Sequence, residues 1–337
     1  MKKLSIVSIF LMAVLCFSSC GKSFRDGAKE KGFNSGIALA AGSFLDPNVA
    51  KIVKENSYIV VSENSMKWQN LRPNKTFWNW NDVDQLIKFA DENGMIVKWH
   101  TLFWHQQNSN FISSNWTREE ALAAMDEHIE TIMTRYKGKI KEYDVVNEMF
   151  EEDGSFRQNV WYKTIGPDYI EHALIKAREV DPDAKLYLNE YNNEEKGNRK
   201  ADAMFNFVKD LKDRGVPIDG VGMQLHLDTS YNYSEEAVRR NIQRYAEIGI
   251  DISFSEVDIR VPMDSVEAHQ ALQTERYLSL YKLAAENSNV KSVITWGWTD
   301  KGSWIPATFP GKGSALMYDA QGKPKPVYNE VKKFLCK

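Results

Sequence analysis

The chain has 337 residues, with 43 lysines and arginines against 46 aspartates and glutamates, and a formal net charge of −3 at pH 7. Charged residues make up 26% and hydrophobic residues 43%, which excludes a disordered chain and a polytopic membrane protein. The near balance of charge, without a basic block, excludes the phosphate backbone of a nucleic acid as the main partner.

The first segment is typical of an export signal. Two lysines precede an apolar run over 4–17 that is too short to span a bilayer comfortably. Small residues then stand directly before Cys20, which resembles the lipobox of bacterial lipoproteins, except that Phe17 takes the place of the usual leucine. We therefore expect a signal peptide over 1–19 and lipidation of Cys20. The protein would then be anchored to a membrane, on its periplasmic or cell-surface side, with plain secretion as the alternative.

The chain has 3 cysteines. If Cys16 leaves with the signal and Cys20 carries lipid, Cys336 has no partner. We then expect no intramolecular disulfide, and a fold stabilised by a large core. The stretch over 20–32 is polar, contains glycine and lacks a periodic apolar pattern, so it is predicted to be a tether before a single domain over 33–337.

Within this domain, short apolar runs alternate with longer stretches of helical spacing. The predicted strands cover 36–40, 58–62, 96–99, 143–146, 186–188, 220–223, 252–255 and 290–295. The predicted helices cover 48–55, 82–93, 118–136, 169–180, 201–214, 235–248, 268–287 and 326–335. Several helices end at glycine or asparagine, as expected of C-caps. The strands are too apolar to be half-exposed, which favours a parallel sheet covered by helices.

Eight βα units in about 300 residues predict an α/β fold, a single (β/α)8 TIM barrel. A doubly wound open sheet is the alternative, but no Gly-x-Gly-x-x-Gly follows the first strand. No Pro/Ser-rich linker, long charge block or fixed-period repeat separates a second domain.

Polar side chains recur where the predicted strands end. They lie in the blocks 63–68, 100–105, 147–148, 189–192, 224–226, 256–258 and 296–300. Such groups are costly in a core, and in a (β/α)8 barrel the C-terminal strand ends and the following loops form the active site. The recurrence therefore predicts one shared site.

Two glutamates stand out among these residues. Glu148 follows the fourth strand and Glu256 the seventh, so both can project into one barrel mouth from opposite sides. Such a pair can cleave a glycosidic bond, because one carboxyl protonates the leaving oxygen while the other attacks the anomeric carbon. Asn147 offers an amide to a sugar hydroxyl. His226 and Asp258 can form a hydrogen-bonded chain that keeps Glu256 ionised and oriented.

Other kinds of site fit less well. His100 and His105 are five apart and flank a tryptophan, which does not match the helical His-Glu-x-x-His arrangement of zinc enzymes. Neither a Gly-x-Ser-x-Gly nucleophile nor a phosphate loop occurs. We therefore expect no catalytic metal and no cofactor.

Three tryptophans, Trp104, Trp296 and Trp304, lie in the predicted mouth loops. An aromatic face stacks on the C–H face of a pyranose while amides and carboxylates bind its hydroxyls. We expect these rings to contact a sugar, with core packing as the alternative.

Six ordered blocks of the sequence match a known family. They are Glu-Asn-Ser-Met-Lys-Trp at 63–68, His-Thr-Leu-Phe-Trp-His at 100–105, Asp-Val-Val-Asn-Glu at 144–148, Gln-Leu-His-Leu at 224–227, Ser-Glu-Val-Asp-Ile at 255–259, and Trp-Gly-Trp-Thr-Asp at 296–300 with Ser303 and Trp304 following. Over about Phe33 to Phe334 the chain resembles the glycoside hydrolase family 10 endo-β-1,4-xylanases. The resemblance implies a (β/α)8 barrel and retaining hydrolysis of β-1,4-xylan, with xylan or xylo-oligosaccharides as the partner.

The resemblance also implies roles for the matching residues. Glu148 would be the acid/base and Glu256 the nucleophile, with His226 bonded to the nucleophile and Asp258 behind it. The sugar at the cleavage point would be served by Asn147 and Gln224. The next sugar on the non-reducing side would be bound by Glu63, Asn64 and Lys67, with the subsites walled by His100, Trp104, Trp296 and Trp304.

Several positions depart from the family pattern. They are Lys98-Trp99 before His100, 106–109 without the usual Leu-Pro, Tyr143 in place of Trp, and Glu190 in place of Asp. The catalytic pair is untouched, so the departures bear on the preferred chain length and side-chain decoration. Two other functions stay open: a lipid-anchored glycan-binding protein without turnover, and a barrel hydrolase that acts on another β-1,4-glycan.

Overall fold

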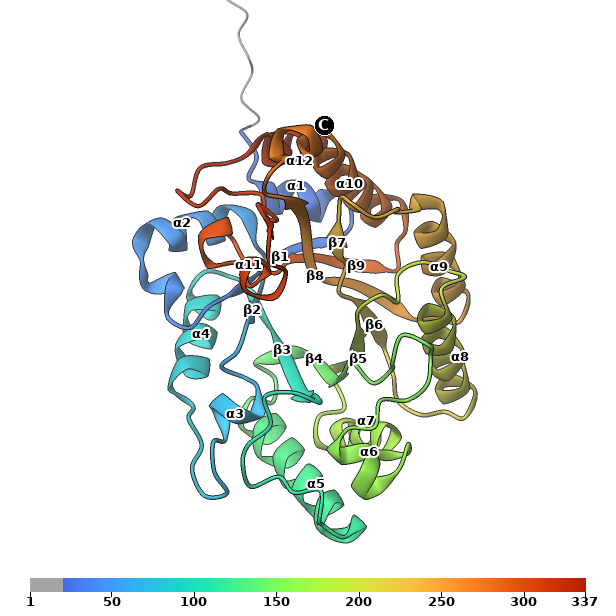
Figure 1. Ribbon diagram of the computed structural model, residues 1–337. Helices are drawn as coiled ribbons and strands as arrows, with labels where there is room; N and C mark the ends of the chain where they lie inside the picture. The colour runs from blue at the N-terminus through green and yellow to red at the C-terminus, as the bar shows by residue number, and fades with distance from the viewer. Residues whose placement is uncertain (1–20) are drawn as a thin grey trace, which may run out of the picture.

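The computed structural model describes residues 21–337 and shows a closed barrel of eight parallel strands surrounded by helices (Figure 1). The barrel strands are β1 (Asn34–Leu39), β2 (Ile59–Ser62), β3 (Ile96–Phe103), β4 (Ile140–Asn147), β5 (Lys185–Glu190), β6 (Gly220–Met223), β8 (Asp251–Pro262) and β9 (Val290–Thr295). The ring closes where β9 pairs in parallel with β1. The predicted (β/α)8 barrel is confirmed.

The outer layer contains the eight predicted helices. They are α2 (Pro47–Asn56), α4 (Asn81–Glu92), α5 (Arg118–Arg135), α7 (Tyr169–Val180), α8 (Arg199–Asp213), α9 (Glu235–Glu247), α10 (Val266–Glu286) and α12 (Pro326–Leu335). Side-chain caps define several starts, as in α5, where Thr117 and Glu120 form a capping box. In the described part of the chain no helix is long and apolar enough to cross a membrane.

Short elements occupy the loops. They are the helices α3 (Trp68–Leu71), α6 (Val160–Ile165) and α11 (Ile305–Thr308), the 3-10 turns η1 (Ser43–Leu45) and η2 (Asp300–Gly302), and the strands β7 (His226–Asp228) and β10 (Lys312–Gly313). None of these was predicted, because each is too short to carry a periodic apolar pattern.

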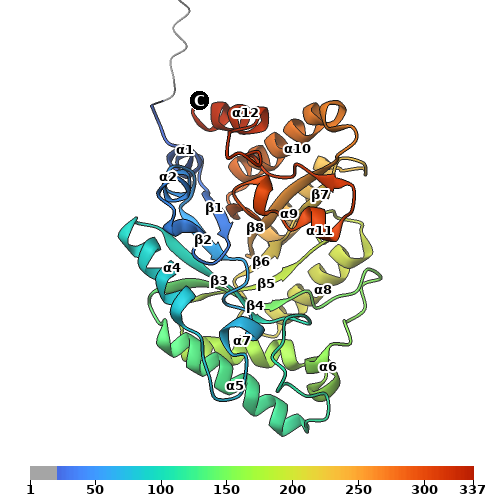
Figure 2. The same cartoon turned by 60° about the vertical axis from the view of Figure 1, so that its left-hand side comes forward.

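The segment before β1 corrects one prediction. The helix α1 (Phe24–Glu30) lies within the stretch that was predicted to be a tether, and it lies beside α12 (Figure 2). Phe24 is buried and its ring stacks on Tyr328 of α12, with centroids 5.5 Å apart. A methyl group at Gly27 would lie 2.8 Å from the Leu335 carbonyl, so this glycine allows α1 to approach α12. Seven residues with so few apolar side chains carry too little pattern to be recognised.

The predicted signal peptide and the lipidation of Cys20 lie outside the described residues. Cys336 caps the C-terminal end of α12 and is disulfide-bonded. The expectation of no intramolecular disulfide applies to a chain that has lost Cys16 and carries lipid on Cys20, so it stays a prediction.

The barrel interior makes room for large polar side chains next to glycines. On β6, Gly220 and Gly222 face the interior, where a methyl group would lie 2.1 Å from the Tyr187 ring and 1.9 Å from Asn189 Oδ1 respectively. Val221 and Met223 alternate with them and are buried in the main hydrophobic core. Tyr187 and Asn189 on β5 therefore fill the space that β6 leaves open.

The strand β8 is longer than predicted and carries part of the site. It runs to Pro262, so Glu256 and Asp258 lie within the strand rather than after it. The short strand β7 pairs in parallel with this extension, with His226 opposite Asp258. The barrel wall is therefore extended at the mouth, and it holds these side chains on regular backbone.

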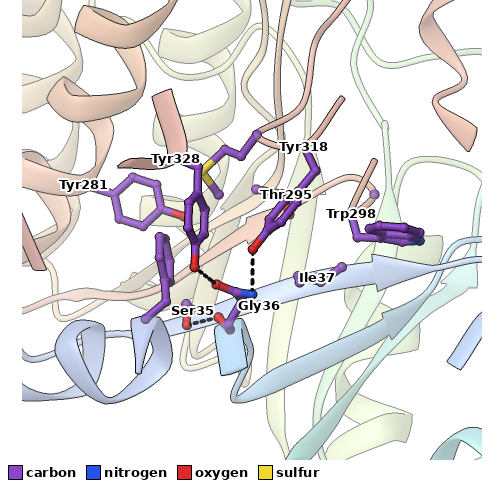
Figure 3. A pocket seen from close by; sticks show the side chains of 12 residues that line it. Ser35, Gly36, Ile37, Tyr281, Thr295, Trp298, Tyr318 and Tyr328 are labelled. Atoms are coloured by element: carbon purple, nitrogen blue, oxygen red, sulfur yellow. Dashed lines mark hydrogen bonds between the residues drawn. The ribbon is translucent and has the colours of Figure 1, made fainter. Parts of the chain in front are cut away.

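A small cavity lies between the barrel wall and the outer helices (Figure 3). Tyr318 and Tyr328 direct their hydroxyls to Asn56, which donates to the first over 3.1 Å and accepts from the second over 2.9 Å. The cavity measures about 10 Å³, which is about the room that one water molecule needs. It is too small for a sugar.

Candidate active site

Glu148 follows β4 directly and is held from two sides. Its backbone has a φ of 56°, and its N–H donates to the Asn189 carbonyl over 2.8 Å. Its carboxyl oxygen Oε1 accepts from Asn147 Nδ2 and from Gln224 Nε2, each over 3.2 Å. The carboxyl is largely buried, and its direction is set by groups from three strand ends.

The other carboxyl oxygen of Glu148, Oε2, lies 3.5 Å from His105 Nδ1. Burial, together with the charge of Arg157, lowers the pKa of His105 to about 4, so the ring is neutral at pH 7. Gln106 Nε2 lies 3.0 Å from His105 Nε2. Because an amide nitrogen only donates, His105 Nε2 accepts, and Nδ1 carries the proton that faces Glu148.

Glu256 is 5% exposed and accepts hydrogen bonds at both oxygens. Asn189 Nδ2 donates to Oε1 over 2.7 Å, and His226 Nε2 lies 3.3 Å from Oε2. Burial raises the pKa of Glu256, but the charges of His100 and His226, the hydrogen bond from His226 and the charge of Lys67 outweigh it and bring the pKa to about 2. The carboxylate is therefore ionised at neutral pH.

His226 is oriented from behind by Asp258. His226 Nδ1 lies 3.0 Å from Asp258 Oδ2, and the same oxygen accepts from Trp304 Nε1 over 2.8 Å. Burial lowers the pKa of His226, but Asp258 and Glu256 outweigh it and raise the pKa to about 10. The predicted chain of Asp258, His226 and Glu256 is thus present as a row of contacts.

One amide network joins the two glutamates. Asn147 Oδ1 accepts from Asn189 Nδ2 over 2.8 Å and from Gln224 Nε2 over 3.2 Å. Asn189 also donates to Glu256, and Gln224 to Glu148. The two carboxyl groups, which are far apart in the sequence, therefore lie at the two ends of one hydrogen-bonded cluster.

Lys67 lies beside two of the three tryptophans of the predicted sugar site. Its Nζ is 4.6 Å from the centre of the Trp104 ring and 5.9 Å from that of Trp296, and it donates to Asn64 Oδ1 over 3.3 Å. Burial lowers the pKa of Lys67, while the charges of Glu256, Glu148 and Glu63 oppose this shift. Burial also raises the pKa of Glu63 to about 7.

His100 lies deep in the barrel mouth, beside Glu256. It is 2% exposed, its Nδ1 lies 3.0 Å from Asp144 Oδ2, and its Nε2 lies 3.9 Å from Glu256 Oε1. Asp144 is in turn paired with Lys98 over 2.9 Å inside the barrel. Lys98, one of the departures from the family pattern, is therefore part of the support of the site.

Three residues that touch the glutamates were not predicted as site residues. Asn189 and His105 stood in the strand-end blocks, and this position was the only signal that could have identified them. Arg157 lies outside every block, and its Nε donates to the Glu148 carbonyl over 3.0 Å.

The chemistry available at this site is that of two carboxyl groups. Glu256 is ionised, buried and held by donors, which suits attack on an electrophilic carbon. Glu148 is contacted by neutral amides and a neutral imidazole, and a positioned carboxyl group of this kind can transfer a proton to or from a substrate. Within residues 21–337 no cluster of histidine, cysteine and carboxylate side chains has the geometry to hold a metal ion.

Known proteins resemble the chain over nearly its whole length. The family model described as glycosyl hydrolase family 10 matches residues 23–334. Endo-1,4-beta-xylanase B of Thermotoga neapolitana is 36% identical over 97% of this chain and 96% of its own length. Endo-1,4-beta-xylanase A of Phanerodontia chrysosporium is 36% identical over 90% of this chain and 75% of its own length.

Solved structures agree with these matches. The crystal structure of xylanase 10B from Thermotoga petrophila in complex with xylobiose superposes with a TM-score of 0.89 and 37% identity, covering 94% of this chain and 98% of that one. Family match, sequence identity and fold therefore point the same way: the chain belongs to glycosyl hydrolase family 10 and is a glycoside hydrolase.

Proposed function

We propose that the protein is a retaining endo-β-1,4-xylanase that hydrolyses internal β-1,4-xylosidic bonds of xylan by double displacement. Glu148 is the acid/base and Glu256 the nucleophile. The observation that carries this proposal is the network that joins Glu148 and Glu256 through Gln224, Asn147 and Asn189. The substrate is proposed from relatives that are named xylanases and from a relative that binds xylobiose.

In the first step the two carboxyl groups act together. Protonated Glu148 gives its proton to the glycosidic oxygen, and the Glu256 carboxylate attacks the anomeric carbon, so that the glycosidic bond breaks and an ester bond to Glu256 forms. In the second step the Glu148 carboxylate takes a proton from water while the water oxygen attacks the same carbon. The ester breaks, Glu256 is released and the sugar regains its original configuration.

The surroundings of Glu256 suit this cycle. Asn189 and His226 each contact one carboxylate oxygen, so the carboxylate attacks without first rearranging. His226 is held by Asp258, whose Oδ2 is also bound by Trp304. A carboxylate that leaves in the second step returns to the same donors, which favours hydrolysis of the ester.

Sugar binding is assigned to the side chains around Lys67. The exposed Asn64 and the partly exposed Glu63 lie beside it, and the rings of Trp104 and Trp296 face its ammonium group. These groups combine hydroxyl ligands with aromatic faces, as a xylose site requires. Asn147 and Gln224 serve the sugar at the cleavage point, and the subsites are walled by His100, Trp104, Trp296 and Trp304.

The test compares the hydrolysis of xylan with that of carboxymethyl cellulose by measuring the release of reducing ends. Proton NMR then identifies the anomer of the first product. The expected result is cleavage of xylan with early release of the β-anomer. Binding of xylan without new reducing ends would favour a glycan-binding protein. Faster cleavage of carboxymethyl cellulose would favour another β-1,4-glycan, and early release of the α-anomer would overturn the retaining mechanism.

We also propose that the protein is exported and lipid-anchored through Cys20. The support is the sequence of the first segment and its small residues before Cys20. One sulfur cannot form both a lipid thioether and a disulfide, so a disulfide between Cys20 and Cys336 would exclude lipidation of Cys20. Membrane fractionation of the wild type and of Cys20→Ala, with mass spectrometry of the mature N-terminus, tests the proposal. A peptide that links Cys20 to Cys336 would contradict it.

A further inference from the structure

The backbone at Glu148 is in a conformation that side chains rarely adopt. Its φ is 56°, in the left-handed region that favours glycine. A residue of this kind keeps its conformation only where its surroundings hold it. On the N-terminal side the backbone is fixed by the hydrogen bond from the Glu148 N–H to the Asn189 carbonyl. On the C-terminal side it is fixed by a residue that does not contact the carboxyl group of Glu148.

That residue is Arg157, whose guanidinium contacts four oxygen atoms of the surrounding backbone and side chains. Its Nε donates to the Glu148 carbonyl over 3.0 Å, and its Nη2 donates to the Phe150 carbonyl over 3.0 Å and to the Tyr191 hydroxyl over 3.0 Å. Its Nη1 lies 3.1 Å from a carboxylate oxygen of Glu151. The guanidinium is planar and rigid, so these contacts fix the direction in which the chain leaves Glu148.

The buried carboxyl group of Glu190 binds the backbone after Glu148 from the other side. Glu190 accepts from the Phe150 N–H over 2.9 Å and from the Tyr191 N–H over 3.1 Å. Its carboxyl group lies 3.0 Å from Lys200 Nζ, and both side chains are fully buried. Burial raises the pKa of Glu190 to about 8, while the charge of Lys200 opposes this shift. The peptide groups that follow Glu148 thus have their carbonyls bound by Arg157 and an N–H bound by Glu190.

We propose that Arg157, supported by the contacts of Glu190 with Lys200 and with the backbone, is a positioning residue for the carboxyl of Glu148. The proposal rests on the acid/base role of Glu148 proposed above. The neutral groups around the Glu148 carboxyl orient the side chain. The position of the carboxyl group, however, depends on the conformation of the Glu148 backbone. Arg157 therefore acts through the Glu148 carbonyl and makes no contact with the reacting atoms.

The consequence is a defect specific to proton transfer. In Arg157→Met the backbone of Glu148 loses its C-terminal hold, and displacement of a catalytic group by about 1 Å costs about 10²-fold in rate. We expect kcat on xylan to fall by about that factor. Aryl xylobiosides with good leaving groups need little protonation in the first step, so formation of the glycosyl ester is expected to fall far less.

Azide provides a second readout that a merely structural role would not move. It attacks the anomeric carbon of the Glu256 ester without needing a base, forms a carbon–nitrogen bond and releases the Glu256 carboxylate. We expect azide to accelerate turnover of an activated aryl xylobioside by Arg157→Met and to yield the β-glycosyl azide. The wild type, whose Glu148 is in place, should show neither effect.

Two further variants make the experiment decisive. Arg118→Met removes another arginine that binds a backbone carbonyl, that of Ile165, and pairs with Asp168 at the surface. This control should keep the leaving-group dependence of the wild type. Glu148→Ala is the positive control and should show the strongest leaving-group dependence and azide rescue.

The outcomes separate the two proposals. If Glu148→Ala shows both signatures and a folded Arg157→Met shows neither, the positioning role is wrong while the acid/base role stands. If Glu148→Ala shows neither, the acid/base role itself fails. If Arg157→Met does not fold, Arg157→Lys decides, because an ammonium group keeps the charge but cannot bind the four oxygens in the fork geometry of a guanidinium. It should show the same signatures more weakly, and their absence would overturn the proposal.

Discussion

Asn189 donates a hydrogen bond of 2.7 Å from Nδ2 to Oε1 of Glu256. The same nitrogen donates to Asn147, and Asn189 Oδ1 accepts from Ser255 Oγ over 2.6 Å. Asn189 is fully buried, so no water can replace these partners. One amide on β5 therefore orients the proposed nucleophile on β8 and connects it to the end of β4.

Replacing this amide with a carboxylate should disable the site. In Asn189→Asp the donor to Glu256 is lost and two carboxylates face each other in a buried place. We expect kcat on an aryl xylobioside to fall by about 10²–10³-fold, the usual cost of one preorganised donor. Asn115→Asp, on an exposed loop, is the matched control and should keep wild-type kinetics. Unchanged kcat in Asn189→Asp would contradict the role given to Asn189.

The glycines of β6 offer a test of the same contact from the other side. Gly222→Ala would place a methyl group 1.9 Å from Asn189 Oδ1, so Asn189 must shift from the position in which it donates to Glu256. Gly220→Ala causes a similar overlap, 2.1 Å from the Tyr187 ring, deeper in the barrel. Overpacking of this kind costs about 1–3 kcal/mol of stability in both variants. We expect kcat per folded molecule to fall only in Gly222→Ala, measured alongside thermal unfolding. An equal fall in both would contradict this.

The pair of His226 and Asp258 predicts a shift in pH dependence. Asp258 is the main group that raises the pKa of His226, and charged His226 helps to hold the pKa of Glu256 at about 2. In Asp258→Asn the pKa of His226 falls, so less positive charge remains to oppose the effect of burial on Glu256. The pKa of Glu256 therefore rises. Because Glu256 must be ionised to attack, the acidic limb of the kcat/KM profile should move to higher pH.

Asp228→Asn is the control for that shift. Asp228 pairs with Arg260 and Lys312 near the same strands but does not contact His226 or Glu256. The acidic limb of the kcat/KM profile of Asp228→Asn should coincide with that of the wild type. An acidic limb that stays in place in Asp258→Asn would show that Asp258 does not act on Glu256 through His226.

Glu63 predicts a stability effect whose size depends on pH. Burial raises its pKa from 4.5 to about 7, so the unfolded chain loses this proton near pH 4.5 while the folded protein retains it until near pH 7. The folded state is thus destabilised as pH rises through this window, by at most about 3 kcal/mol. Glu63→Gln removes this cost and should raise the free energy of unfolding at pH 8 but hardly at pH 4. Chemical unfolding at both pH values measures it, and equal changes would contradict it.

Much of this fold could be read from the residues themselves. The eight predicted helices are present with ends within about two residues, because apolar periodicity and capping residues act over short distances along the chain. The strand of Glu256 was predicted to end at 255 but runs to Pro262. The extension carries polar side chains, and it forms a strand because it pairs with β7. That pairing cannot be predicted from the local sequence pattern.

The helix α1 shows the same limit in another form. Phe24 and Ala28 are too few to mark an amphipathic helix, and what makes it part of the fold is contact with α12 at the other end of the chain. The positions of Glu148 and Glu256 after or within barrel strands, by contrast, were readable because strand order in a barrel brings strand ends together.

The sequence by itself therefore determined the alternation of strands and helices, the barrel, the family and the two glutamates that stand out at its mouth. Only the tertiary structure decided how those glutamates are held: Asn189 between them, Arg157 behind Glu148, and Lys98 with Asp144 behind His100. The physical reason is that periodicity follows from neighbours along the chain. The partner of a buried polar group, in contrast, is chosen by the packing of segments that meet only after the barrel closes.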